Sequence, residues 1–101
     1  MAVMEVTVLP IGTDTTSCSP YVAAALDIAR KDKHVRCALN PMGTILEGEL
    51  ADLYDCIRRM QENVFSKGCN RVYSVIKVDD RRDKYKTPEE KIQSVEEKLH
   101  D

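Results

Sequence analysis

The sequence predicts an α+β fold, a four-stranded antiparallel sheet with two helices on one face and a third helix at the C-terminus. Three observations lead to this prediction: segments of alternating apolar residues, segments with helical spacing, and turn residues between them. The chain has 101 residues, of which 43% are hydrophobic and 32% charged, as expected of one compact domain. We expect a single domain over residues 1–101, with its core in residues 1–80 and a charged turn and helix in residues 81–101.

The first strand and the first helix are indicated by the spacing of apolar residues, which changes from alternation to helical spacing along the chain. Residues 3–9 are rich in β-branched side chains and stop at Pro10, which is typical of a strand end. Ser19 and Pro20 are typical of a helix start, because a hydroxyl caps the first turn and proline fits the first helical position. The helix is expected to reach Lys31, since apolar residues recur at helical spacing: Val22, Ala25, Leu26 and Ala29.

The remaining core elements follow the same reasoning. Residues 35–39 and 44–47 are expected to form a hairpin, because the Asn-Pro-Met-Gly sequence between them favours a turn. Residues 71–79 are expected to form the fourth strand. The second helix is expected to end at Gly68, which suits a left-handed cap. Its predicted stripe is Leu50, Leu53, Tyr54, Ile57, Gln61, Val64 and Phe65.

The order β-α-β-β-α-β, with a central hairpin, is typical of the ferredoxin-like arrangement, in which both helices cover one face of the sheet. The other face would then carry either Tyr73 and Val75 or Ile76 and Val78, depending on the register. An exposed apolar patch of this kind usually marks an interface. We therefore expect a symmetric homo-oligomer, a dimer or a tetramer.

A last helix is indicated by the capping-box sequence Thr87-Pro88-Glu89-Glu90. Its apolar stripe consists only of Ile92, Val95 and Leu99. Three apolar side chains do not stabilise an isolated helix, so this helix is expected to dock on another surface.

Composition excludes several classes of function. A net charge of −2 gives no sign of nucleic acid or an acidic membrane as a partner. The longest apolar run, residues 21–26, is too short to cross a membrane. The N-terminus resembles no export signal, so a cytoplasmic location is expected, and the isolated cysteines are expected to be reduced thiols.

The spacing of side chains also argues against a metal site and against catalysis. The two histidines lack ligand-spaced neighbours, and the loop after the first strand contains a single cysteine. That loop has no Arg, Lys or His to activate Ser17 or Cys18 as a nucleophile. We expect no metal, no cofactor and no enzymatic activity.

The candidate site combines this loop with the hairpin. A helix start with neighbouring hydroxyls offers hydrogen-bond donors and a positive dipole to a polar ligand. Ser19 alone is better explained as a plain helix cap, and a carboxylate such as Glu47 near a strand end is usually solvated. Thr44 and Glu47 are expected on opposite faces of their strand. If Glu47 nevertheless lines the same cleft as Asn40 and Thr44, these groups match a polar heterocycle. The candidate ligand-binding residues are Ser17, Ser19, Tyr21, Asn40, Met42, Thr44 and Glu47.

Several ordered segments along nearly the whole chain resemble the small thiamine-binding protein family. The matching runs are Leu9-Pro10-Ile11-Gly12-Thr13, Ser17-Cys18-Ser19-Pro20-Tyr21-Val22-Ala23, Asn40-Pro41-Met42-Gly43-Thr44 with Glu47-Gly48, and Arg71-Val72 with Ile76-Lys77-Val78-Asp79-Asp80-Arg81-Arg82-Asp83-Lys84. The resemblance implies non-catalytic binding of thiamine (vitamin B1) or its hydroxymethylpyrimidine moiety. It also implies a cytoplasmic homo-oligomer, commonly a tetramer built from dimers.

For such a ligand, chemistry suggests a role for each candidate. The aminopyrimidine ring needs donors and acceptors, which Asn40, Thr44 and the two serines offer. Glu47 would accept from the amine or balance the thiazolium charge. Tyr21 would stack on that cation, and Met42 would form an apolar wall.

Two alternatives stay open at this point. One is an oligomeric interaction protein without a small-molecule role, and the other is an enzyme of thiamine salvage. The charged run of residues 79–84 is interpreted as a solvated turn with ion pairs, or as part of a subunit contact.

Overall fold

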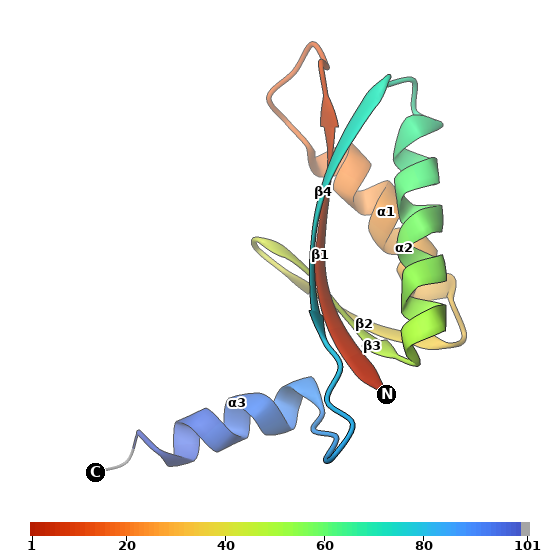
Figure 1. Cartoon of the computed structure of the whole chain (residues 1–101). Helices are drawn as coiled ribbons and strands as arrows, with labels where there is room; N and C mark the ends of the chain where they lie inside the picture. Colours follow the sequence, from red (N-terminus) through yellow and green to blue (C-terminus); the bar gives the residue numbers. More distant parts are fainter. Residues whose placement is uncertain (100–101) are drawn as a thin grey trace.

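The computed structural model describes residues 1–99. Four strands form one antiparallel sheet in the order β2-β3-β1-β4, and α1 and α2 cover the same face of it (Figure 1). This is the ferredoxin-like arrangement, so the predicted fold class is confirmed. The elements are β1 (Ala2–Ile11), α1 (Ser19–Lys31), β2 (Val35–Asn40), β3 (Gly43–Gly48), α2 (Leu50–Phe65), β4 (Arg71–Asp79) and α3 (Pro88–Glu97).

The core lies between the sheet and the two helices. Burial alternates along β1, with Met4, Val6 and Val8 turned toward the helices, as the period-two pattern predicts. The buried face of α2 is rotated relative to the predicted apolar stripe, because two members of that stripe, Tyr54 and Phe65, are exposed. The α2 side chains that enter the core are Leu53, Cys56, Ile57, Met60 and Val64.

Two predicted element ends are wrong. β1 continues through Pro10 to Ile11 because it stays paired with β4 as far as Arg71. Its pairing with β3 stops at Val6 and Thr44, so from there β4 is its one neighbour. A strand with one neighbour tolerates proline. Ser19 does not cap α1: it is the first helical residue, and the N-cap is Cys18, which makes no side-chain cap.

The other predicted ends are close to the observed ones: β2 reaches Asn40, β3 spans Gly43–Gly48, and α2 ends at Phe65, before Gly68. Gly68 follows α2 with a φ of 104°, a left-handed conformation that favours glycine. The capping box at α3 is present, because Thr87 Oγ1 accepts from the Glu90 N–H at 3.1 Å and Glu90 Oε1 accepts from the Thr87 N–H at 3.1 Å. These reciprocal bonds set the start of α3.

The sheet face away from α1 and α2, here called the open face, is largely uncovered. The register assigns Tyr73 and Val75 to this face, where they are 57% and 44% exposed. α3 projects away from the sandwich on the side of the open face (Figure 1), and no α3 side chain is buried. Within the described chain, the α3 residues Ile92 and Val95 stay exposed, as does Leu99 just after the helix.

A partly buried ion pair joins the two core helices. Asp32, the C-cap of α1, has a side chain only 8% exposed; it accepts the His34 N–H at 2.9 Å and pairs with Arg59 of α2. Burial alone would raise the pKa of Asp32, but the His34 N–H and the Arg59 guanidinium together lower it below its usual value.

Because the folded-state pKa of Asp32 is lowered, its contribution to stability is complete above the unfolded pKa and is lost as the pH falls through the folded one. We expect the free energy of unfolding to fall below about pH 5. Asp32→Asn should lower the free energy of unfolding at pH 7 by about 1.5–3 kcal/mol. It should also make this free energy depend less on pH in the acid range. Asp27→Asn, at an exposed α1 ion pair, should change it by less than about 0.5 kcal/mol. Urea unfolding at several pH values checks both, and equal effects of the two variants would contradict the prediction.

Candidate ligand-binding site

A pocket opens where β3 separates from β1. The β1–β3 pairing ends at Val6 and Thr44, so beyond this level β1 has a free edge on the hairpin side. The pocket has a volume of about 310 Å³ and lies between this edge, the start of α1 and the tip of the β2–β3 hairpin. Its lining is Thr7, Val8, Leu9, Cys18, Val22, Ala25, Leu39, Asn40, Pro41, Met42, Gly43, Thr44 and Met60. A small, mostly apolar hollow with a few polar groups is typical of a ligand site.

The hairpin tip is fixed against β1 and forms one wall of the pocket. Thr7 Oγ1 donates to the Met42 carbonyl at 3.1 Å. A Cβ atom at Gly43 would lie 3.2 Å from both Glu5 Cγ and Thr7 Oγ1. Glycine therefore permits this close approach, and a larger residue would require the Glu5 and Thr7 side chains to shift.

Thr44 supplies a buried polar group to the pocket. It is only 5% exposed, lies on the helix-covered side of β3, and lines the pocket. Its hydroxyl takes part in none of the side-chain hydrogen bonds found within residues 1–99. The hydroxyl is not one of the fully buried polar atoms without a partner, so it keeps access to the pocket and can exchange a hydrogen bond with a ligand or water.

A second hollow of about 440 Å³ adjoins the first on the α1 side. The two share five lining residues, which are Cys18, Val22, Leu39, Asn40 and Pro41. The outer hollow adds Ser19, Ala23 and Leu26 from α1. We call the first the inner pocket and the second the outer hollow.

The structure brings four of the seven candidates to this region. Asn40, Met42 and Thr44 line the inner pocket, and Ser19 lines the outer hollow. Ser17 is exposed in the loop and lines neither hollow, although it is next to Cys18, which lines both. Tyr21 packs against the core instead.

Glu47 lies on the other side of the sheet. Thr44 and Glu47 are three positions apart in β3, and alternation turns them to opposite faces. The carboxylate is therefore on the open face, and the structure does not place it in one cleft with Asn40 and Thr44.

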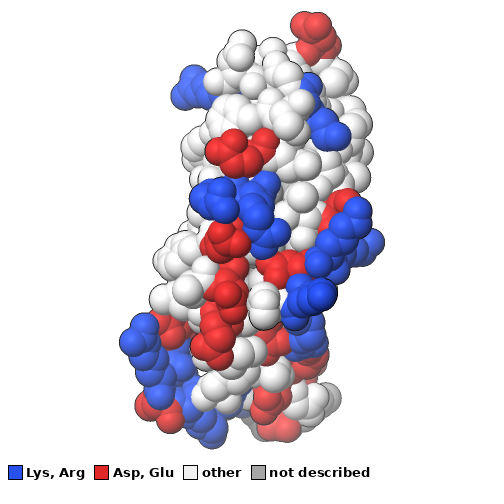
Figure 2. All heavy atoms as spheres, turned by 90° about the vertical axis from the view of Figure 1, so that its right-hand side faces the viewer, with Lys and Arg blue, Asp and Glu red and all other residues white. Residues whose placement is uncertain are grey.

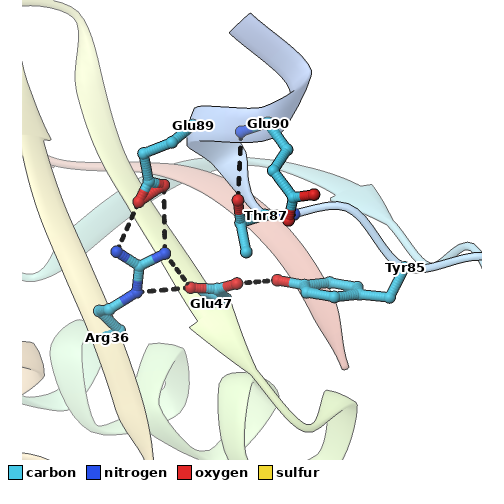
Figure 3. Close-up of polar contacts among 6 residues, drawn as sticks. All are labelled: Arg36, Glu47, Tyr85, Thr87, Glu89 and Glu90. Atoms are coloured by element: carbon cyan, nitrogen blue, oxygen red, sulfur yellow. Dashed lines mark hydrogen bonds and ion pairs between the residues drawn. The ribbon is translucent and has the colours of Figure 1, made fainter. Parts of the chain in front are cut away.

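Glu47 is the centre of a polar network (Figure 3). Its side chain is 6% exposed, accepts from Arg36 Nε at 2.6 Å and accepts from the Tyr85 hydroxyl. Arg36 also donates to both Glu89 oxygens, at 2.6 and 3.2 Å. Burial and the Glu47 carboxylate raise the pKa of Tyr85, which keeps its hydroxyl a donor. The network ties β2, β3 and the base of α3 together.

The sequence contained a signal for part of this network. With a turn at Asn40 to Gly43, Arg36 pairs directly across from Glu47, and opposite charges in such positions attract. The pocket residues Cys18, Val22 and Met60 carried no such signal, because an apolar side chain at helical spacing is indistinguishable from a core residue. The described residues contain no group of three or more His, Cys, Asp or Glu able to hold a metal ion. None of the helices in this part of the chain is long and apolar enough to span a membrane.

Comparison with known proteins gives consistent matches over the whole chain. A sequence model of the family described as thiamine-binding protein matches residues 4–96. The UPF0045 protein YqgV of Bacillus subtilis is 45% identical over 98% of each chain. A UPF0045 protein of Methanothermobacter thermautotrophicus is 44% identical over 98% of this chain and 100% of the relative.

Solved structures show the same fold. MJ1052 of Methanocaldococcus jannaschii superposes with a TM-score of 0.86 and is 33% identical, covering 95% of this chain and 96% of the other. A Thermotoga maritima protein described as a candidate thiamine biosynthesis or salvage protein has a TM-score of 0.76 at 17% identity, over 93% of this chain and 97% of its own. At that identity the similarity concerns the fold alone.

Proposed function

This chain belongs to the thiamine-binding protein family, and on that basis we propose that it binds thiamine or its hydroxymethylpyrimidine moiety without altering it, as a carrier, buffer or sensor. The observation that carries the proposal is the inner pocket, with the hydroxyl of the largely buried Thr44 among apolar walls. The family description supports the choice of ligand.

The chemistry of the inner pocket matches an aminopyrimidine. The ring has an exocyclic amine that donates and ring nitrogens that accept. The Thr44 hydroxyl and the Asn40 amide each both donate and accept, and the free edge of β1 adds backbone groups. Val8, Val22 and Met60 offer apolar contact for the flat ring, while the charged thiazolium would lie toward the outer hollow.

The lining supports binding rather than catalysis. Cys18 is the one thiol that lines the inner pocket. A thiol needs a neighbouring base or cation to become a strong nucleophile. The described lining of both hollows contains no His, Lys, Arg, Asp or Glu that would activate it.

Thr44→Val tests the proposal directly. It keeps the side-chain shape but removes the hydroxyl, and should weaken binding of hydroxymethylpyrimidine by about 0.5–1.5 kcal/mol, roughly two- to twelvefold. Glu47→Gln, across the sheet, should change the affinity by less than twofold. Calorimetry with thiamine and with hydroxymethylpyrimidine checks this. No heat from either ligand at millimolar concentration would refute the proposed function.

We also propose that the chain self-associates. The open face exposes Tyr73 and Val75, and α3 presents an apolar stripe that its own chain leaves uncovered. A second copy related by a two-fold axis would cover both surfaces at once. Sedimentation at micromolar concentration should show a dimer or tetramer, and Val75→Asp should shift it toward smaller species. A wild-type monomer would contradict this.

A further inference from the structure

The β4 edge of the sheet exposes apolar side chains on both of its faces. β4 is nine residues long, contains no proline and pairs with β1 along its whole length. Its other edge has no partner strand within residues 1–99, and no helix crosses in front of it in Figure 1. Tyr73 and Val75 are exposed on the open face, while the register places Ile76 and Val78, 38% and 43% exposed, on the helix side. Proteins normally shorten, bend or cover so long an edge.

The neighbouring side of α2 adds to this uncovered surface. Gln61 Nε2 donates to Ser74 Oγ at 2.7 Å, which places that side of α2 beside β4. Tyr54 and Phe65 lie seven and four positions from Gln61, and therefore on the same side of the helix. They are 50% and 40% exposed. Figure 2, seen from the side of the helices, shows few charged side chains over the upper end of the molecule, where α2 ends.

The sequence of β4 is complementary to itself. If two copies of β4 pair antiparallel about Val75, Arg71 lies opposite the partner's Asp79, and Tyr73 lies opposite the partner's Lys77. Opposite charges in facing positions of two strands attract, and an ammonium group beside a tyrosine ring adds a cation–π contact. A two-fold axis through Val75 repeats each pair, so every one of these contacts forms twice.

Charge disfavours the neighbouring registers. Side chains alternate between the two faces of a strand, so the register can shift only in steps of two residues. A shift in one direction places Arg71 opposite Lys77, which is a like-charge pair. A shift in the other direction places it opposite Arg81, beyond the end of β4. Pairing about Val75 is therefore the register that the charges favour.

We infer that two copies of this chain join along β4 into one eight-stranded antiparallel sheet, four strands from each copy, with Val75 on the two-fold axis. The inference rests on the proposed self-association and specifies its interface. The α2 helices of both copies then lie on the same side of the joined sheet, with Tyr54 and Phe65 turned toward the other copy. This contact covers apolar side chains on both faces of β4 at once, which packing of two open faces does not.

Cysteine cross-linking of the full chain tests this register. Residues directly opposite in an antiparallel pair have Cα atoms about 4.5–5.5 Å apart, which is within the range of a disulfide. Val75→Cys should therefore form a disulfide-linked dimer under mild oxidation, and a reductant should separate it. Tyr73→Cys and Lys77→Cys should each give no linked dimer alone, but co-expression of the two variants should give one. The wild-type protein measures any linkage through the native cysteines.

The outcomes separate this interface from self-association in general. If the wild-type protein sediments as a monomer, the proposed self-association fails, and this inference fails with it. If the protein is oligomeric but Val75→Cys gives no more linked dimer than the wild-type protein, the β4 interface is wrong and self-association stands. The same holds if Lys77→Cys alone is linked as efficiently as Val75→Cys.

Charge reversal tests the electrostatic part of the interface. Arg71→Glu creates two like-charge pairs with Asp79 across the axis and should weaken the dimer about tenfold in sedimentation equilibrium. Adding Asp79→Lys restores two opposite-charge pairs and should recover most of the affinity. The matched control Arg30→Glu, at an exposed position of α1, should leave association unchanged. Equal weakening by Arg71→Glu and Arg30→Glu, or no recovery in the double variant, would overturn the proposed register.

Discussion

Val22→Trp should abolish binding of both thiamine and hydroxymethylpyrimidine. Val22 projects from the first turns of α1 and lines both hollows, so an indole at this position would fill the passage between them. The side chain is only half-buried, and tryptophan has room to extend into the hollow, which limits the cost of overpacking. Calorimetry should detect no binding, while urea unfolding should show a folded protein.

The matched control is Val22→Ala, which enlarges the pocket at the same position. It should still bind, with an affinity reduced only by the lost apolar contact. If Val22→Trp is folded and binds as tightly as the wild-type protein, the ligand occupies a different surface.

Arg36→Met should lower the free energy of unfolding, and by more than the loss of an ion pair between two exposed side chains would. Glu47 is almost fully buried, and Arg36 is its charged partner. Without Arg36, the carboxylate would keep only the Tyr85 hydroxyl and would be left charged beneath the C-terminal segment. We expect this loss of stability to be smaller than for a fully buried ion pair, because the Arg36 side chain is itself 58% exposed. Urea unfolding at pH 7 measures the change.

The double variant Arg36→Met with Glu47→Leu separates pairing from packing. Replacing both partners by apolar side chains removes the unpaired charge, so the double variant should be more stable than Arg36→Met alone. If the two losses simply add, Glu47 and Arg36 do not act as a pair. Ligand affinity should change little in either variant, because the network lies across the sheet from the inner pocket.

The fold was predictable because apolar side chains recur at different spacings in its strands and in its helices. β1 alternates, α1 and α2 repeat at helical spacing, and Gly68 marks a helix end by its chemistry. The errors lie at the ends of elements. Pro10 was interpreted as a strand end, but its strand continues beyond the pairing with β3, where β4 is its one neighbour, and the sequence does not show where the β1–β3 pairing stops.

The site was predictable only in part. The turn sequence brought Asn40, Met42 and Thr44 together, because one hairpin carries all three. Alternation along the strand already predicted that Thr44 and Glu47 face opposite sides of the sheet. The structure has them on opposite sides, so they do not line one cleft. Val22 could not be recognised, because its helical spacing is that of a core residue, and only the three-dimensional gap between β1 and β3 makes it part of a pocket.

The central claim is that the ligand binds between the hairpin tip and the start of α1. Titration of ¹⁵N-labelled protein with hydroxymethylpyrimidine, followed by amide NMR shifts, tests it most directly. We expect the largest shifts in residues 18–22 and 39–44. Shifts confined to Arg36, Glu47 and Tyr85 on the open face would contradict the account.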